Sequence, residues 1–377
     1  MISPALRRAF CFHTLPAFLF PSTMLHCRHL FTLLFASLLP TLLCAQTDPQ
    51  TLARRYSPES WQAQRVHRSV EVLTVGDGPA RAYVFMPQNP SAQGAPLVLF
   101  QHGWLGMNPK NFGGLIDLLV RRGAVVIYPV YQDGDQTPPQ RVTTIAAQAD
   151  AAALALVQMR HPELVDTRKV LYLGFSMGAS ISLNLALRPE SYGLPAPRAL
   201  LLISPGDAHH VAKGALAESI IGRVETLPAD LPTVLVSGLA DTGIGVPTAR
   251  AIAARLCHLP EQKRALLFFP SDSDEGVRIQ AGHGSPGAPD SRYDFPDSRA
   301  RVPSSIPGRN DFEASASLNL LDYYGYWRLA TRLLDWVDGA PYPDEIFNRS
   351  RADNRFLGLW PSGKPYAEAL SENPCPN

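Results

Sequence analysis

The sequence predicts an α/β domain in which helices cover both faces of a mostly parallel β-sheet. Short apolar runs typical of strands alternate with helical stretches along most of the chain. The apolar runs at residues 97–101 and 124–130 fit strands that are buried on both faces. The composition, with 46% hydrophobic and 18% charged residues in 377, is that of an ordinary globular protein.

Each predicted element follows from its local pattern. Residues 70–75 and 80–86 are predicted to form an opening hairpin around Gly76-Asp77-Gly78. The remaining predicted strands are residues 97–101, 124–130, 170–173, 199–203, 233–236 and 265–269, and the predicted helices are residues 143–159, 177–187, 249–257 and 314–337. The last helix has two opposite apolar stripes, so we expect the tail after Gly339 to cover one of them.

The chain is predicted to hold one domain, at residues 46–339, because no internal repeat or change of composition marks a second. Residues 284–311 form a long insertion rich in Pro, Ser, Asp and Arg, which is typical of functional or mobile loops. Residues 340–377 are predicted to form a C-terminal tail packed on the domain.

Residues 1–45 are predicted to be a signal peptide. Arg28 precedes an uncharged apolar run, and Cys44-Ala45 ends it with the small residue expected at a cleavage point. Met24 is an alternative start, which would make residues 1–23 a misassigned extension. We therefore expect a secreted or periplasmic protein; a lipid anchor on Cys44 is the alternative.

Two cysteines, Cys257 and Cys375, remain after the predicted signal peptide. In an oxidising compartment an isolated pair is usually bridged, so a disulfide between them is predicted; two separate thiols are the alternative. The formal net charge of +1 indicates no nucleic-acid partner. The apolar run of the signal peptide is too short for a comfortable membrane span, so no stable span is predicted.

The pentapeptide Gly174-Phe175-Ser176-Met177-Gly178 lies between a predicted strand and a predicted helix. This is the G-x-S-x-G pattern of a nucleophile elbow, in which a serine occupies the tight turn from strand to helix. Glycines stand two residues before and after the serine because Cβ atoms there would collide. We therefore predict that Ser176 is a nucleophile in a strained backbone conformation, with its hydroxyl above the sheet.

A serine hydroxyl needs a base within hydrogen-bond reach and an acid that orients the base. Asp241 follows the predicted strand 233–236, at the edge where the carboxyl ends of parallel strands gather, and is the predicted acid. Asp207 is the alternative acid, and either could instead be a cap or turn residue. His258 ends a helix before the last strand, whereas His283 follows that strand; His283 is therefore the predicted base.

An oxyanion needs backbone N–H donors, and two are predicted. Met177 follows the nucleophile at the start of a helix, whose dipole adds a positive end. Trp104 lies in the loop His102-Gly103-Trp104, where glycine lets the backbone turn an N–H inward. Gly103 and Trp104 are also predicted to line the substrate cleft, with core packing as the alternative for Trp104.

No cofactor is predicted. His209 and His210 are adjacent, but the sequence offers no second cluster at ligand spacing and no Gly-rich phosphate loop. The expected partner is a small or polymeric ester, and the oligomeric state is left open.

Together these residues resemble the α/β-hydrolase superfamily, over about residues 70–337. The closer likeness is to dienelactone-hydrolase-like enzymes, cutinase-like polyester hydrolases and platelet-activating-factor acetylhydrolase-like esterases, through His102-Gly103-Trp104, the pentapeptide around Ser176, Asp241 and His283. The methionine after the serine and the aromatic residue after His102-Gly103 are similar to the polyester hydrolases in particular. The resemblance implies a three-layer α/β-hydrolase fold with a Ser-Asp-His triad. Some secreted relatives also have a C-terminal disulfide. The insertion and the tail depart from the pattern, so the substrate is not carried over.

The sequence therefore predicts a secreted serine hydrolase of the carboxylesterase type, which acts through an acyl-enzyme. Two alternatives keep the same fold: a binding protein without catalytic activity, and a peptidase or amidase. The triad serves esters and amides equally, so the residues give no basis for separating them.

Overall fold

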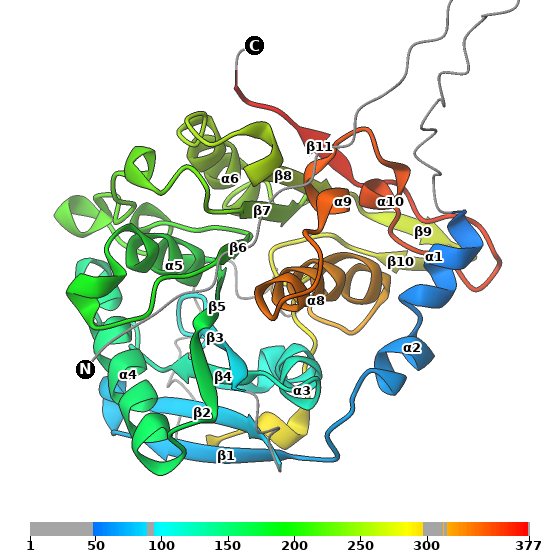
Figure 1. The fold of residues 1–377 in the computed structure, drawn as a ribbon. Helices are drawn as coiled ribbons and strands as arrows, with labels where there is room; N and C mark the ends of the chain where they lie inside the picture. The colour runs from blue at the N-terminus through cyan, green and yellow to red at the C-terminus, as the bar shows by residue number, and fades with distance from the viewer. Residues whose placement is uncertain (1–47, 89–93, 297–311, 313–314, 376–377) are drawn as a thin grey trace, which may run out of the picture. The chain divides into compact units, whose positions relative to one another are not determined.

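A nine-stranded sheet forms the centre of the computed structural model, which describes residues 48–88, 94–296, 312 and 315–375 (Figure 1). Its strands in chain order are β1 (Val70–Val75), β2 (Ala82–Pro87), β3 (Ala95–Gln101), β4 (Val125–Pro129), β5 (Val165–Phe175), β6 (Ala199–Ile203), β7 (Thr233–Gly238), β8 (Arg264–Phe269) and β11 (Leu370–Glu372). Their spatial order is β1-β2-β4-β3-β5-β6-β7-β8-β11. Strands β3 to β8 are parallel, whereas β1, β2 and β11 pair antiparallel at the edges. The predicted α/β class with a mostly parallel sheet is confirmed.

Helices pack on both faces of this sheet. Figure 1 shows α3 (Gly113–Arg121) and α8 (Trp327–Val337) on one side, and α4 (Pro139–Arg160), α5 (Met177–Leu187) and α6 (Gly245–Ala254) on the other. Successive strand residues point to opposite faces. Accordingly, Phe100 of β3 joins the core beneath α3 and α8, and Leu99 joins the core beneath α4, α5 and α6. Both faces of the central strands are therefore buried.

Helix α4 is the one helix of the described residues with the length and apolar character of a membrane span. Half of that apolar stretch is buried inside the protein, as in the core helix of a soluble domain. The structure is thus compatible with the prediction that the chain has no stable span.

The end of the chain adds a strand to the sheet. In the described part of the tail, β11 pairs antiparallel with β8, and Leu370 lies opposite Phe268. Two short helices, α9 (Asp344–Phe347) and α10 (Ala352–Arg355), precede it. The buried guanidinium of Arg328 on α8 donates to main-chain carbonyls of the tail, among them Asn354 at 3.0 Å and Phe356 at 3.1 Å. The tail is thereby fixed to the domain.

The N-terminal segment also covers α8. Helices α1 (Pro49–Arg55) and α2 (Pro58–Ala63) precede the sheet, and Trp61 of α2 packs edge-to-face on Trp327 at 6.4 Å between ring centroids. The apolar stripe that contains Trp327 is therefore covered in part by this N-terminal segment, whereas Tyr342 of the tail packs on Trp336 of the other stripe.

The helix predicted at 314–337 begins later than predicted, because residues 316–319 are not helical and the continuous helical stretch starts at Leu320. A π-helical segment, η10 (Asp322–Tyr326), precedes α8, and Ser317 to Asn319 are not helical. Asn319 accepts from the backbone N–H of Leu321 at 2.9 Å, and Asp322 accepts from that of Asn319 at 2.8 Å. These side chains offer the backbone partners that compete with helical hydrogen bonds, which explains the later start.

The helix predicted at 249–257 is displaced, since α6 spans Gly245–Ala254. Pro247 lies in its first turn, where the missing N–H leaves no hydrogen bond unmade. Part of the 284–311 insertion is described and contains the 3₁₀ turn η8 (Ser291–Tyr293), whose Tyr293 is buried. The predicted signal peptide, Cys44 and residues 297–311 lie outside the described residues.

Candidate active site

Ser176 lies in the tight turn between β5 and α5, as the G-x-S-x-G pattern predicts. Its backbone has φ +54° and ψ −123°, and the residue is 8% exposed. A Cβ atom on Gly174 would lie 2.2 Å from the carbonyl oxygen of Gly178, and one on Gly178 would lie 2.0 Å from that of Gln101. Both glycines are therefore required by close backbone approach, and the strained serine is held by its surroundings.

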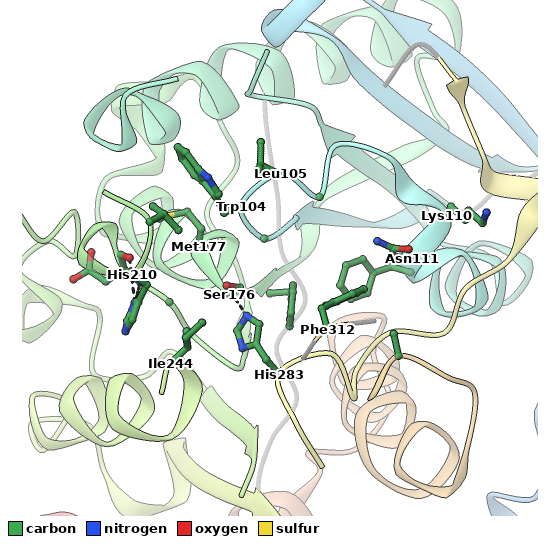
Figure 2. A pocket seen from close by; sticks show the side chains of 18 of the residues that line it. Trp104, Leu105, Lys110, Asn111, Ser176, Met177, His210, Ile244, His283 and Phe312 are labelled. Carbon is green, nitrogen blue, oxygen red and sulfur yellow. Dashed lines mark hydrogen bonds between the residues drawn. The ribbon is translucent and has the colours of Figure 1, made fainter. Parts of the chain in front are cut away.

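Ser176, His283 and Asp241 form one hydrogen-bonded line. Nε2 of His283 lies 3.0 Å from Oγ of Ser176 (Figure 2). Nδ1 of the same ring lies 2.7 Å from Oδ2 of Asp241. The carboxylate only accepts, so the neutral imidazole carries its proton on Nδ1. The lone pair of Nε2 then faces the serine hydroxyl, which is the arrangement that a general base needs.

Asp241 follows β7 and is held in a nearly closed site. The residue is 4% exposed, and Ser237 Oγ lies 3.4 Å from Oδ2. A Cβ atom on Gly245, at the start of α6, would lie only 2.1 Å from the same oxygen. The carboxylate is therefore fixed between the end of one strand and the start of the next helix.

The loop that carries His283 is fixed by contacts from far along the chain. It follows β8 and the small hairpin of β9 (Asp272–Asp274) and β10 (Val277–Ile279). Ser315 Oγ accepts from the backbone N–H of Gly284 at 3.0 Å, and Ser285 Oγ lies 2.8 Å from the hydroxyl of Tyr326. Burial raises the pKa of Tyr326 well above its usual range, so this hydroxyl stays protonated. The two residues that follow His283 are thereby anchored.

His102 is a structural residue of the loop after β3. It is fully buried, and burial lowers its pKa to about 4. Its ring stacks on Tyr131 at 4.0 Å, and Nε2 lies 2.8 Å from the carbonyl oxygen of Val130. The next turn is fixed by Gln132, whose Oε1 accepts from the N–H of Leu105 at 2.8 Å. These contacts hold the segment that contains Gly103 and Trp104.

Trp104 and Met177, the predicted oxyanion donors, both line the same cavity as Ser176. Among the described residues no hydrogen bond is found for the backbone N–H of either one. Gly206 borders the space between the reacting atoms: a Cβ atom there would lie 3.0 Å from Ser176 Oγ and 3.3 Å from Met177 N. The indole of Trp104 is half-buried against the core beneath α4, α5 and α6, so it both packs and faces the cavity.

The cavity over Ser176 has a volume of about 460 Å³, and most of its wall is apolar. Figure 2 shows Ser176 and His283 between two more polar ends, with Asn111 and Lys110 at one and His210 at the other. The residues that line it are Gly103, Trp104, Leu105, Gly106, Lys110, Asn111, Phe112, Phe175, Ser176, Met177, Gly206, Asp207, His210, Val211, Ile244, His283, Pro289, Phe312 and Ala316. Gly103 and Trp104 thus lie where the sequence predicted them, in the wall of the cleft.

The competing candidates make other contacts, although Asp207 also lines the cavity. Asp207 accepts from the backbone N–H groups of Ala208 at 2.7 Å and Ile220 at 2.9 Å, so it is a cap and turn residue. His258 Nε2 lies 3.0 Å from the carbonyl oxygen of Leu227. In the part of the chain that the structure describes, no group of three or more His, Cys, Asp or Glu side chains is arranged to hold a metal ion.

Sequence reasoning missed several residues of the cavity. Asn111, His210 and Ile244 follow the carboxyl ends of strands, so their position after β3, β6 and β7 could have indicated them. Phe312 carries no such signal, because it comes at the far end of a long insertion without periodicity.

Cys257 and Cys375 are joined in a disulfide with a Cα–Cα distance of 5.5 Å. Cys257 follows α6, and Cys375 follows β11, so the bond closes the tail onto the main domain at the edge of the sheet. The alternative of two separate thiols does not fit this geometry.

A scan against protein-family models found no match for this chain, and a search of curated proteins found no match either. The site is therefore interpreted from its own geometry.

Proposed function

We propose that this protein is a serine hydrolase that cleaves carboxylic esters through an acyl-enzyme. The observation that carries the proposal is the line of Ser176, His283 and Asp241, with contacts of 3.0 and 2.7 Å. A nucleophile, a base and an orienting carboxylate at hydrogen-bond distance are what acyl transfer requires. Ser176 and His283 line a largely apolar cavity, where a substrate displaces water.

In the first half of the reaction, Ser176 Oγ attacks the ester carbonyl while His283 Nε2 takes the hydroxyl proton. Asp241 stabilises the imidazolium that forms and keeps the ring in place. The N–H groups of Met177 and Trp104 donate to the oxyanion of the tetrahedral intermediate. His283 then returns the proton to the leaving alcohol.

In the second half, water attacks the acyl-enzyme. His283 removes a proton from that water, and the acid is released when the proton returns to Ser176 Oγ. The dipole of α5 adds a positive end close to the oxyanion in both halves.

We assign the chain to the α/β-hydrolase superfamily as part of this proposal. The nucleophile turn after a central parallel strand and the chain order serine, acid, histidine support the assignment. The likeness to dienelactone-hydrolase-like enzymes, polyester hydrolases and platelet-activating-factor acetylhydrolase-like esterases rests on His102-Gly103-Trp104 and the triad residues in their chain order, and Trp104 and Met177 favour the polyester hydrolases among them. A secreted or periplasmic location is the matching proposal, supported by the N-terminal sequence and by the disulfide.

Two variants and an inhibitor test this function. A phosphonofluoridate should label Ser176, and Ser176→Ala and His283→Ala should each lose nearly all turnover of a p-nitrophenyl ester. His258→Ala is the matched control, since that histidine lies away from the cavity and should keep full activity. Undiminished turnover by Ser176→Ala would refute the assignment. A p-nitroanilide assayed in parallel separates an esterase from an amidase.

A further inference from the structure

His210 lines the cavity at the end opposite Asn111, with Ser176 between them (Figure 2). It ends the 3₁₀ turn η4 (Ala208–His210), which follows β6. Its neighbour His209 is different: the side chain is 56% exposed, and its ring packs on that of His210 at 3.8 Å. The pair therefore places one imidazole at the cavity and one in solvent.

The proton of the neutral His210 ring has a definite position. The backbone N–H of Asp207 donates to Nδ1 at 2.9 Å, and an N–H group can only donate. The carbonyl oxygen of Asp207 lies farther from the same nitrogen, at 3.1 Å. An unprotonated Nδ1 can accept the shorter of these two hydrogen bonds, from the N–H of Asp207, so the ring carries its proton on Nε2.

The ring is also held neutral. Burial lowers the pKa of His210 most, and the neighbouring His209 and His283 lower it further, against the opposing effect of Asp207. Among the described residues, no hydrogen bond is found for Nε2. A fixed, uncharged N–H donor is thus available at the end of an apolar cavity, where a bound ligand that displaces water must supply an acceptor or leave the donor unpaired.

We propose that His210 determines substrate specificity by donating its Nε2–H to a second oxygen acceptor of the substrate. The inference rests on the proposed ester hydrolysis and deepens it. The preferred substrates are esters that carry an ether, carbonyl or further ester oxygen a few bonds from the scissile ester, because a plain alkyl chain leaves this donor unpaired.

Two substrate pairs test the proposal, one for each side of the scissile bond. On the acyl side, p-nitrophenyl methoxypropanoate is compared with p-nitrophenyl pentanoate, which replaces the ether oxygen by a methylene group. On the alcohol side, methoxyethyl butanoate is compared with butyl butanoate. We expect the ratio of kcat/KM for the ether ester over its alkyl partner to respond to His210 in one of the two pairs.

Two variants separate substrate recognition from a purely structural role. His210→Asn keeps an acceptor for the N–H of Asp207 but removes the distal donor, and should lower the ratio about 3- to 10-fold. His210→Gln keeps a distal N–H and should hold the ratio near the wild-type value. If His210 only fixed the turn, His210→Asn would keep the wild-type ratio and His210→Gln would change it. His209→Asn is the control and should leave the ratio unchanged.

The outcomes are distinct. A ratio that is unchanged in His210→Asn for both pairs, in an enzyme that hydrolyses all four esters, overturns the role of His210 and leaves the proposed function standing. A wild-type protein that hydrolyses no ester overturns both. The ¹⁵N shifts of the imidazole, measured at neutral pH without substrate, should show the Nε2–H tautomer, and an Nδ1–H or charged ring would also refute the inference.

Discussion

Gly245 is packed directly against the carboxylate of Asp241, so replacing it by alanine tests how the acid positions His283. The new Cβ atom would lie 2.1 Å from Oδ2 of Asp241 and 2.3 Å from Oγ of Ser237. Ordinary van der Waals contact begins at 3.4 Å, so the carboxylate oxygen must move by roughly 1 Å. That oxygen is the one that lies 2.7 Å from His283 Nδ1.

The expected effect of Gly245→Ala follows from this displacement. A misplacement of about 1 Å in a catalytic constellation reduces the rate about 100-fold, so kcat should fall by about that factor while KM changes little. The overpacking should also lower the free energy of unfolding by about 1–3 kcal/mol. Hydrolysis of p-nitrophenyl butanoate and urea unfolding measure the two effects separately.

The same loop offers a matched control. A Cβ atom on Gly243 would meet nothing within 4 Å, so Gly243→Ala should keep wild-type kcat and stability. If Gly245→Ala retained kcat within threefold of the wild type, the carboxylate would not depend on this packing, and the reasoning would be refuted.

Three further predictions concern acid stability, the oxyanion space and the disulfide. His102 has a pKa of about 4 in the folded protein and about 6.5 in the unfolded chain, so the unfolded state binds more protons between these pH values. Urea unfolding should therefore show that about 3 kcal/mol of the free energy of unfolding is lost between pH 6.5 and pH 4 because of this residue. His102→Gln should abolish this pH-dependent loss. Gly206→Ala places a methyl group 3.0 Å from Ser176 Oγ and 3.3 Å from Met177 N, and should lower kcat about 100-fold without lowering the melting temperature. Full activity of this variant would show that the oxyanion does not bind in the space beside Gly206. Cys375→Ser opens a loop that spans 118 positions and should lower the free energy of unfolding by about 2–5 kcal/mol, a loss that dithiothreitol should reproduce only in the wild type.

The class of the fold and the contacts among the predicted triad could be anticipated from the sequence because they depend on local signals at strand ends. Ser176 directly follows one buried apolar run and Asp241 lies just past the end of another, and parallel strands bring their carboxyl ends to one edge. His283 needed a further argument, since the β9–β10 hairpin separates it from β8. Chain order supplied that argument, and the structure places the three side chains in contact.

The support of the histidine loop could not be anticipated. Ser315 and Tyr326 hold residues 284 and 285 from 31 and 41 positions away, and neither is marked by a local pattern. Strand β11 was also missed, because three residues that pair at a sheet edge are too short to show alternation. The late start of the last helix reflects side chains of Asn319 and Asp322 that pair with backbone N–H groups, which hydrophobic periodicity does not record.

The geometry of the site depends on close approach between backbone segments more than on the catalytic side chains themselves. Gly178 lets the serine turn touch the end of β3, and Gly245 lets α6 begin against the carboxylate of Asp241. In both places the absence of a Cβ atom lets backbone segments pack closely around a residue of the triad and hold it in position. Side chains in such sites have little room to relax, so a single methyl group should affect turnover more than it affects folding. The ratio of these two effects in Gly245→Ala therefore measures how far the carboxylate is preorganised.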